Sequence, residues 1–364
     1  MVRKIIAAIL SGIALFAFAF VVINAVPPDP AEILSKNVIE KGLSLSENKI
    51  ITPVYEDKSP ESITLFPNGC DPSDLFSFYD SEKQRRENEK QLQIEPEEDT
   101  RVLQAGEHPI TEKDLSGNQS PGNIKIKNET NYPIDANFLL SNAYPISYSN
   151  AAPLVLIVHT HGTECYMQNG AITYSDTTPT RSKDINSNVV GIGKVFAQTL
   201  EENGIPTLHC ETMFDSPSYS LAYDESEKAV VGFLTQYPSI RYVFDIHRDS
   251  IVYSSGEMGK TVAYSQDGTP YAQAMFVVGS DFLGADHPNW LSNNMTVASY
   301  FQNALIESFP SLMRPINVRG ASFNAEHSPG SLLIEIGTCG NSISEAQNTA
   351  RFLAQTISSV IRSH

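Results

Sequence analysis

Residues 154–166 read LVLIVHTHGTECY, and this stretch decides the fold class. Its first five residues are all apolar, which is typical of a strand buried on both faces of a parallel sheet. The apolar run ends in two histidines, a glycine and a glutamate. Ligands of parallel sheets bind at the carboxyl ends of the strands. The stretch therefore predicts an α/β domain with a polar site where this strand ends.

Strand and helix signals alternate from this stretch to the C-terminus. IRYVFDIHRD (240–249), YAQAMFVVGSD (271–281) and GSLLIEIGTCGN (330–341) contain further apolar strands. Apolar residues at helical spacing predict helices over 188–205, 226–238, 289–310 and 344–363. Such alternation favours a mostly parallel sheet with helices on both faces. We expect this α/β domain to span residues 151–364.

The N-terminal residues 1–26 predict a membrane anchor. Residues 5–23 carry no charge, and nineteen residues at helical rise cover the hydrocarbon thickness of a bilayer. Arg3 and Lys4 precede the run, so the positive-inside tendency places the N-terminus in the cytoplasm and the rest outside. A cleaved signal peptide is the alternative, but the run is long and Ile23-Asn24-Ala25 is a poor cleavage site. We expect an uncleaved, single-pass protein of the cell membrane.

Residues 27–150 predict a polar stalk that is mostly disordered. The segment opens with three prolines and contains the charge-dense run EKQRRENEKQLQIEPEED (82–99). The whole chain has a formal net charge of −17, which argues against a nucleic-acid partner. Its four cysteines show no CxxC spacing, so we expect small buried thiols and not a disulfide framework.

A hydrolytic metal site can be assembled from residues near three strand ends. His161, Glu164 and His247 form the two-imidazole, one-carboxylate set that binds catalytic zinc and leaves one position open. Zinc chemistry also needs a carboxylate that takes and returns a proton, and Glu335 in LLIEIG is placed for that role. Each of these residues alone would be an ordinary polar residue at a strand end. Their occurrence at several strand ends favours the site.

Four neighbouring residues are candidates for supporting roles. We expect His159 and Asp245, two residues before His161 and His247, to point to the opposite face of the sheet and to orient a ligand imidazole. Arg248 and Asp249 can form a local ion pair or contact substrate, and the sequence favours neither reading.

The segments VHTHGTECY, KDINSNVVGIGKVFAQTLEENGI, FDIHRD and SPGSLLIEIGTCGNSISEA resemble the stage II sporulation protein P family. The resemblance covers about residues 150–364. The family consists of membrane-anchored peptidoglycan hydrolases, distantly similar to zinc-dependent N-acetylmuramoyl-L-alanine amidases. It implies cleavage of the amide between muramic acid and the stem peptide, a second activity on peptide cross-links, a role in engulfment during sporulation, and a lytic transglycosylase as partner.

The resemblance also implies roles for residues at matching positions. His161 and His247 match the two zinc-binding histidines of the amidases, and Glu335 matches their catalytic glutamate, with Asn341 in the same segment. The carboxylate ligand is either Glu164, from the family's own motif, or Asp184, nearer the position used in the amidases; we expect Glu164. Two alternatives remain beside the amidase: a metal-dependent deacetylase or peptidase of the cell envelope, and a non-catalytic wall-binding scaffold.

Overall fold

A computed structural model of the chain describes residue 103 and residues 106–364, all within one structural unit. The predicted anchor and residues 27–102 of the predicted stalk lie outside these residues. Among the helices of the described part, none is both long and apolar enough to cross a bilayer.

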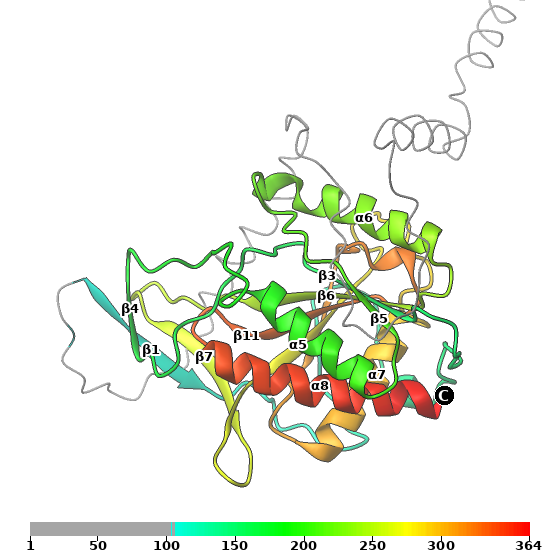
Figure 1. Cartoon of the computed structure of the whole chain (residues 1–364). Coiled ribbons are helices and arrows are strands. Elements are labelled where there is room, and N and C mark those ends of the chain that lie inside the picture. The colour runs from blue at the N-terminus through cyan, green and yellow to red at the C-terminus, as the bar shows by residue number, and fades with distance from the viewer. Residues whose placement is uncertain (1–102, 104–105) are drawn as a thin grey trace, which may run out of the picture. The chain divides into compact units, whose positions relative to one another are not determined.

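A seven-stranded sheet forms the centre of the fold, and Figure 1 labels its strands β11, β6, β3 and β5. The full order is β2-β10-β9-β11-β6-β3-β5. All neighbouring strands are parallel except β9 and β11, so the predicted mostly parallel α/β fold is confirmed. A second, four-stranded sheet has the order β4-β1-β7-β8. The strands are β1 (Glu107–Lys113), β2 (Ile126–Asn128), β3 (Val155–Val158), β4 (Thr173–Ser175), β5 (Thr207–His209), β6 (Tyr242–Asp249), β7 (Met258–Tyr264), β8 (Pro270–Ala272), β9 (Ala274–Gly279), β10 (Ile316–Arg319) and β11 (Leu332–Thr338).

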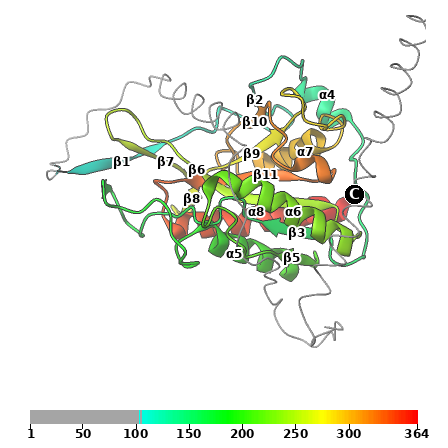
Figure 2. The ribbon, with the colours of Figure 1, turned by 90° about the horizontal axis from the view of Figure 1, so that it is seen from above.

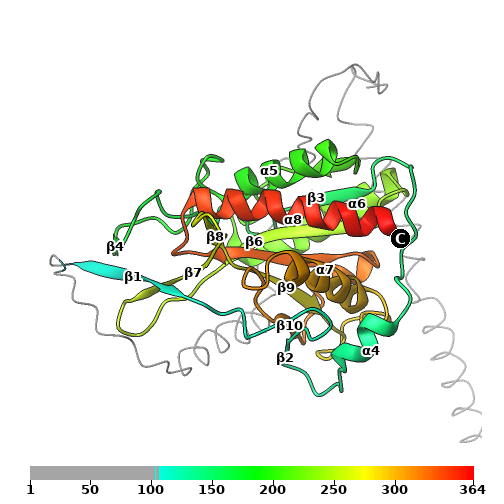
Figure 3. The same ribbon diagram turned by 90° about the horizontal axis from the view of Figure 1, so that it is seen from below.

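Helices cover both faces of the main sheet, as predicted. The helix α6 crosses one face alone (Figure 2), whereas α5, α7 and α8 cover the other (Figure 3). The side chains of β6 alternate accordingly: Phe244 and Ile246 join the core under α5, α7 and α8, and Val243 joins the α6 core. The helices are α4 (Ala136–Ser141), α5 (Val189–Glu202), α6 (Ala222–Gln236), α7 (Asn294–Ser308) and α8 (Ile343–Ser363), with short 3₁₀ turns η1 (Tyr219–Leu221) and η2 (Ala325–His327).

Local sequence signals explain where the two long helices of the larger core begin. Asn188 caps α5, because its side chain accepts hydrogen bonds from the first-turn amides of Val190 and Gly191. Ser342 and Glu345 form a reciprocal capping box at the start of α8. The described cysteines, Cys165, Cys210 and Cys339, are free and buried, as expected.

The folded domain begins earlier than the predicted boundary at residue 151. Strand β1 pairs with β4 and β7, β2 adds to the edge strand β10, and α4 packs near α7 (Figure 3). Residues 107–141 therefore contribute to both sheets and do not belong to a disordered stalk. The short strand β2 lies at a sheet edge, where a strand is held largely by backbone hydrogen bonds and buries few side chains, so its polar sequence carries no strand signal.

Candidate metal centre

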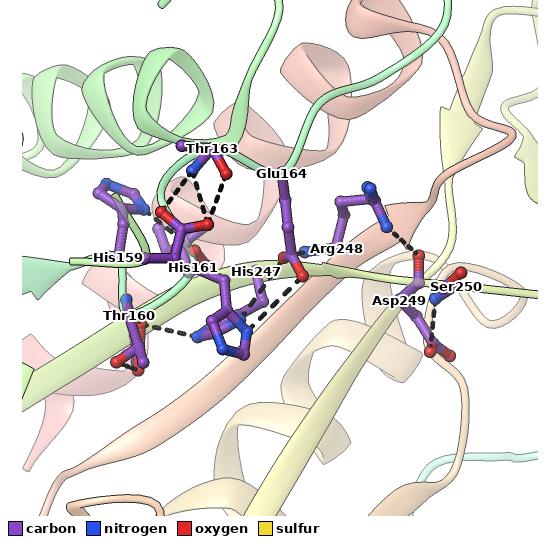
Figure 4. Close-up of polar contacts among 12 residues, drawn as sticks. His159, Thr160, His161, Thr163, Glu164, His247, Arg248, Asp249 and Ser250 are labelled. Carbon is purple, nitrogen blue, oxygen red and sulfur yellow. Dashed lines mark hydrogen bonds and ion pairs between the residues drawn. The ribbon is translucent and has the colours of Figure 1, made fainter. Parts of the chain in front are cut away.

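The three predicted ligands come together beside β3 and β6 (Figure 4). His161 and Glu164 lie in the turn after β3, and His247 lies on the adjacent strand β6. Glu164 Oε1 is 3.7 Å from His161 Nδ1, and Glu164 Oε2 is 3.5 Å from His247 Nδ1. One ligand atom from each residue falls within 4.8 Å of the other two. The group can therefore present two nitrogens and one oxygen to a single ion.

Asp184, the alternative carboxylate, is not part of this group. It is exposed, and its carboxylate accepts hydrogen bonds from the backbone and side chain of Asn186 in its own turn. Its backbone carbonyl accepts from the Ser187 amide, which is also local. The geometry therefore supports Glu164 over Asp184.

Arg248 holds the loop that carries Glu164 in place. Its backbone amide donates to Glu164 Oε2 at 3.2 Å. Its buried guanidinium donates to the backbone carbonyls of Cys165 and Thr180, at 2.9 and 2.6 Å. Because these bonds use the side chain within the protein, Arg248 positions the ligand loop and is not available to substrate. The sequence left a local ion pair with Asp249 open; in the structure the Asp249 carboxylate lies 2.9 Å from Arg314 Nη1, and Arg248 Nη1 donates to the backbone carbonyl of Asp249 at 3.3 Å.

Asp245 lies on the same face of the sheet as His247, contrary to the expectation. Residues two apart on a strand point to the same side, so the assignment to opposite faces was wrong. Asp245 Oδ1 is 2.9 Å from His247 Nε2, which is ion-pair distance. The Thr160 amide and hydroxyl fix the Asp245 carboxylate at 2.8 and 2.6 Å. Asp245 thus stands behind the imidazole of His247, as an orienting carboxylate should.

His159 does lie on the opposite face, because β3 ends at Val158 and the chain turns before His161. Its Nδ1 is 3.0 Å from the Ile246 carbonyl, and its Nε2 is 2.8 Å from Nε2 of His209. A carbonyl only accepts, so Nδ1 of His159 carries the hydrogen and the His209 N–H donates to His159 Nε2. No hydrogen bond or ring contact shown for His159 goes to His161 or His247. His159 therefore stabilises the strands beneath the metal centre and does not contact the ligands directly.

Glu335 stands beside His247 on the neighbouring strand. The two residues are direct partners in the parallel register of β11 with β6. Paired residues on adjacent strands share a face and lie about 4.8 Å apart across the ladder. Glu335 is partly exposed, whereas the residues on either side of it in β11 are buried. Its side chain therefore points to the same face of the sheet as that of His247, and its Oε2 atom is buried there.

Asn341 is a buried anchor below the site. Its Oδ1 accepts from the Thr338 and Thr261 amides, and its Nδ2 donates to the Thr261 carbonyl and to Glu345. These bonds tie the end of β11 to β7 and to the start of α8. None of them reaches the ligand group, so Asn341 supports the strand that carries Glu335.

The charges of the group suit a cation. Burial lowers the pKa of His161 to about 4, so this imidazole is neutral at neutral pH. Burial opposes charge on His247 too, but Asp245 and Glu164 outweigh it and hold the pKa of His247 well above its usual value. Burial would raise the pKa of Asp245, yet His247 lowers it to about 2. Two ionised carboxylates thus flank one imidazole, and the Glu164 carboxylate is in the charged form that a divalent ion takes as a ligand.

Three residues around the site were missed in the sequence. Tyr219 stacks on the His161 ring at 4.4 Å, and Tyr223 meets the same ring edge-on at 5.5 Å. The Arg181 guanidinium also lies over the Tyr219 ring, at 4.4 Å from the ring centroid, and is 3.7 Å from Glu164. All three lie outside the strands, in 176–223, and no spacing signal connects them with the ligands.

Comparison with known proteins identifies the family. The model of the family "Stage II sporulation protein P (SpoIIP)" matches residues 72–358. Stage II sporulation protein P of Bacillus subtilis (strain 168) is 28% identical over 216 residues, which cover 56% of this chain. The chain spans about half the length of this curated relative, since the match covers 50% of it.

Solved amidase structures show a weak likeness. N-acetylmuramoyl-L-alanine amidase AmiC2 of Nostoc punctiforme aligns with a TM-score of 0.35 and 14% identity, over 58% of this chain and 97% of that one. The amidase from Clostridium difficile 630 aligns with a TM-score of 0.33 and 18% identity, over 59% and 97%. At these scores the likeness carries no argument about the site. The family match covers most of the chain by itself: the protein belongs to the stage II sporulation protein P family.

Proposed function

We propose that the chain is a zinc-dependent peptidoglycan hydrolase, an N-acetylmuramoyl-L-alanine amidase that also acts as an endopeptidase, working in engulfment during sporulation. The observation that carries the proposal is the grouping of His161, Glu164 and His247 within ligand distance, with Glu335 in register beside His247. A wall-binding scaffold would gain nothing from burying two carboxylates and several imidazoles at one place, because such burial costs free energy.

The chain's own residues divide the work as follows. His161, Glu164 and His247 would hold a zinc ion, Asp245 orients His247, and Tyr219 covers one side of the His161 ring. A bound zinc ion supplies Lewis-acid chemistry: it polarises a carbonyl and lowers the pKa of water to about 7. Glu335 accepts a proton as water adds to the amide carbon, and returns it to the nitrogen as the C–N bond breaks. The products are a carboxylic acid and an amine, so no further reactant is needed.

The cellular setting of the proposal rests on the family and on the N-terminal sequence. A single-pass anchor at residues 5–23 would keep the catalytic domain outside the membrane, within reach of peptidoglycan. We propose a lytic transglycosylase as partner, since glycan and peptide cleavage together release wall fragments.

A digest of purified peptidoglycan tests the chemistry. We expect the zinc-loaded chain to release stem peptides from muramic acid, and Glu335→Gln to lower the turnover rate by about 10²–10⁴-fold with zinc still bound. Asp184→Asn is the matched control and should keep both zinc and activity. Full activity in Glu335→Gln would remove the mechanism. Released acetate would indicate the deacetylase, and free amino acids the peptidase.

A further inference from the structure

A second cluster of ligand-type side chains lies outside the site described above. It consists of Glu227 on α6 and of Glu326 and His327 in the turn η2. One donor atom from each lies within 4.8 Å of the other two. Nε2 of His327 is 2.9 Å from Glu227 Oε1 and 3.9 Å from Glu326 Oε1. Residues 99 or 100 positions apart in the sequence are thus joined at one point.

The cluster leaves charge and hydrogen-bonding capacity unsatisfied. Both carboxylates pair with the same imidazole, which can offset at most one negative charge. Glu326 Oε1 accepts from the Ser322 hydroxyl, but Glu326 Oε2 is buried and has no hydrogen-bond partner among the described residues. A buried carboxylate oxygen in that state costs free energy unless a ligand reaches it.

A fourth side chain beside the cluster gives an independent sign of a missing partner. His287 is only 4% exposed, and its Nδ1 also has no hydrogen-bond partner among the described residues. Its other nitrogen is held by Asn294 Oδ1 at 3.0 Å. Asn294 in turn donates to the carbonyls of Ala325 and Ser328, at 3.1 and 3.0 Å, so His287 lies next to the turn that carries Glu326 and His327. Two buried polar atoms of different residues therefore lack a partner in the same neighbourhood.

We propose that Glu227, Glu326 and His327 bind a second divalent cation. One imidazole nitrogen with carboxylate oxygens suits a transition-metal ion such as Zn²⁺ better than Ca²⁺, which takes oxygen ligands. The ion would fasten η2 to α6 and so fix the turn before η2. That turn holds Phe323 and Asn324 at φ of 54° and 58°, a left-handed conformation that is strained for Phe.

The turn before η2 contacts the first metal site through Tyr223. Phe323 lies 5.9 Å from Tyr223, ring to ring, and Tyr223 meets His161 edge-on. Asn324 donates to the Tyr223 carbonyl at 3.0 Å. The second ion would therefore hold one wall of the first site without contacting substrate, and its binding does not depend on the proposed hydrolase activity.

Zinc stoichiometry of the metal-stripped full chain, measured by equilibrium dialysis, tests the proposal. We expect a double variant Glu227→Gln/His327→Gln to bind one zinc ion fewer than the unmodified chain. Glu225→Gln, on the same helix and paired only with its neighbour Lys228 in the ion pairs shown, is the control and should lose none.

A second variant separates the two sites. His161→Ala/His247→Ala should lose one zinc ion and keep the ion at Glu227, whatever its effect on hydrolysis. An unchanged stoichiometry in Glu227→Gln/His327→Gln would overturn the proposal and leave the cluster as an ion pair. An unmodified chain that binds both zinc ions but does not hydrolyse peptidoglycan would instead refute the proposed function and leave the second cation in place.

Discussion

Replacement of Gly193 by alanine tests the packing beneath the metal centre. Gly193 lies on α5, and a Cβ there would sit 2.3 Å from His159 Cε1 and 2.9 Å from His209 Nε2. Ordinary carbon contacts need about 3.5 Å, so both rings would have to move. They cannot move freely, because the His159–His209 hydrogen bond of 2.8 Å and the bond to Ile246 fix them in the core.

The magnitude follows from three contributions. Overpacking a buried contact costs about 1–3 kcal/mol, and loss of the imidazole hydrogen bond costs about 1 kcal/mol. Alanine in a helix gains about 1 kcal/mol over glycine. The net prediction is that Gly193→Ala lowers the free energy of unfolding by about 1–3 kcal/mol. Gly232 on α6 has no atom within 4 Å of its would-be Cβ, so Gly232→Ala should raise it by about 1 kcal/mol.

Urea denaturation followed by tryptophan fluorescence measures both variants. Trp290 is the single tryptophan of the chain and is buried, so its emission reports unfolding of this domain. The two glycine variants should shift the midpoint in opposite directions. If Gly193→Ala matched or exceeded the unmodified chain in stability, the close packing of α5 on the two histidines would be refuted.

Three further predictions concern the site and its support. Glu164→Gln should lose the zinc ion of the first site while Asp184→Asn keeps it, as measured by metal analysis, and the reverse result would transfer the ligand role. Asp245→Asn should weaken zinc binding about 10–100-fold in a chelator competition, since His247 loses its orienting carboxylate, and unchanged affinity would contradict that role. Burial lowers the pKa of His159 to about 4 and that of His209 well below its usual value, so the unfolded chain binds more protons below about pH 6.5. Stability should therefore fall as pH drops from about 6.5 towards 4, by up to about 1.4 kcal/mol per pH unit for each histidine with a lowered pKa, and His209→Gln should remove one histidine's share of that slope in urea titrations.

The fold class could be predicted because the buried parallel strands are continuous apolar runs. β3, β6, β9 and β11 all lie within predicted strand segments, and α5 and α8 begin within one residue of their predicted starts. The short strands β2, β5 and β10 could not be found in this way. Three or four residues carry no periodic signal, and their place is fixed by pairing with a neighbour that is distant in sequence.

The metal centre could be predicted in part for the same reason. His161 and Glu164 follow β3, and His247 and Glu335 lie in the carboxyl-terminal halves of β6 and β11, so their nearness is a consequence of parallel topology. Tyr219 and Arg181 could not be predicted, because they lie in long irregular segments whose path depends on tertiary contacts such as the 2.5 Å pair of Arg181 with Asp215.

The pairing register of β11 with β6 decides whether Glu335 lies beside the metal ligands. Because Asp245, His247 and Asp249 share one face of β6, a shift of β11 by one residue would turn Glu335 into the core under α5, α7 and α8. Ile334 and Ile336 would then face the ligands, and the site would keep its metal group but lose its proton carrier. The apolar residues on either side of Glu335 therefore do more than fill the core: their burial enforces the register that sets Glu335 beside His247.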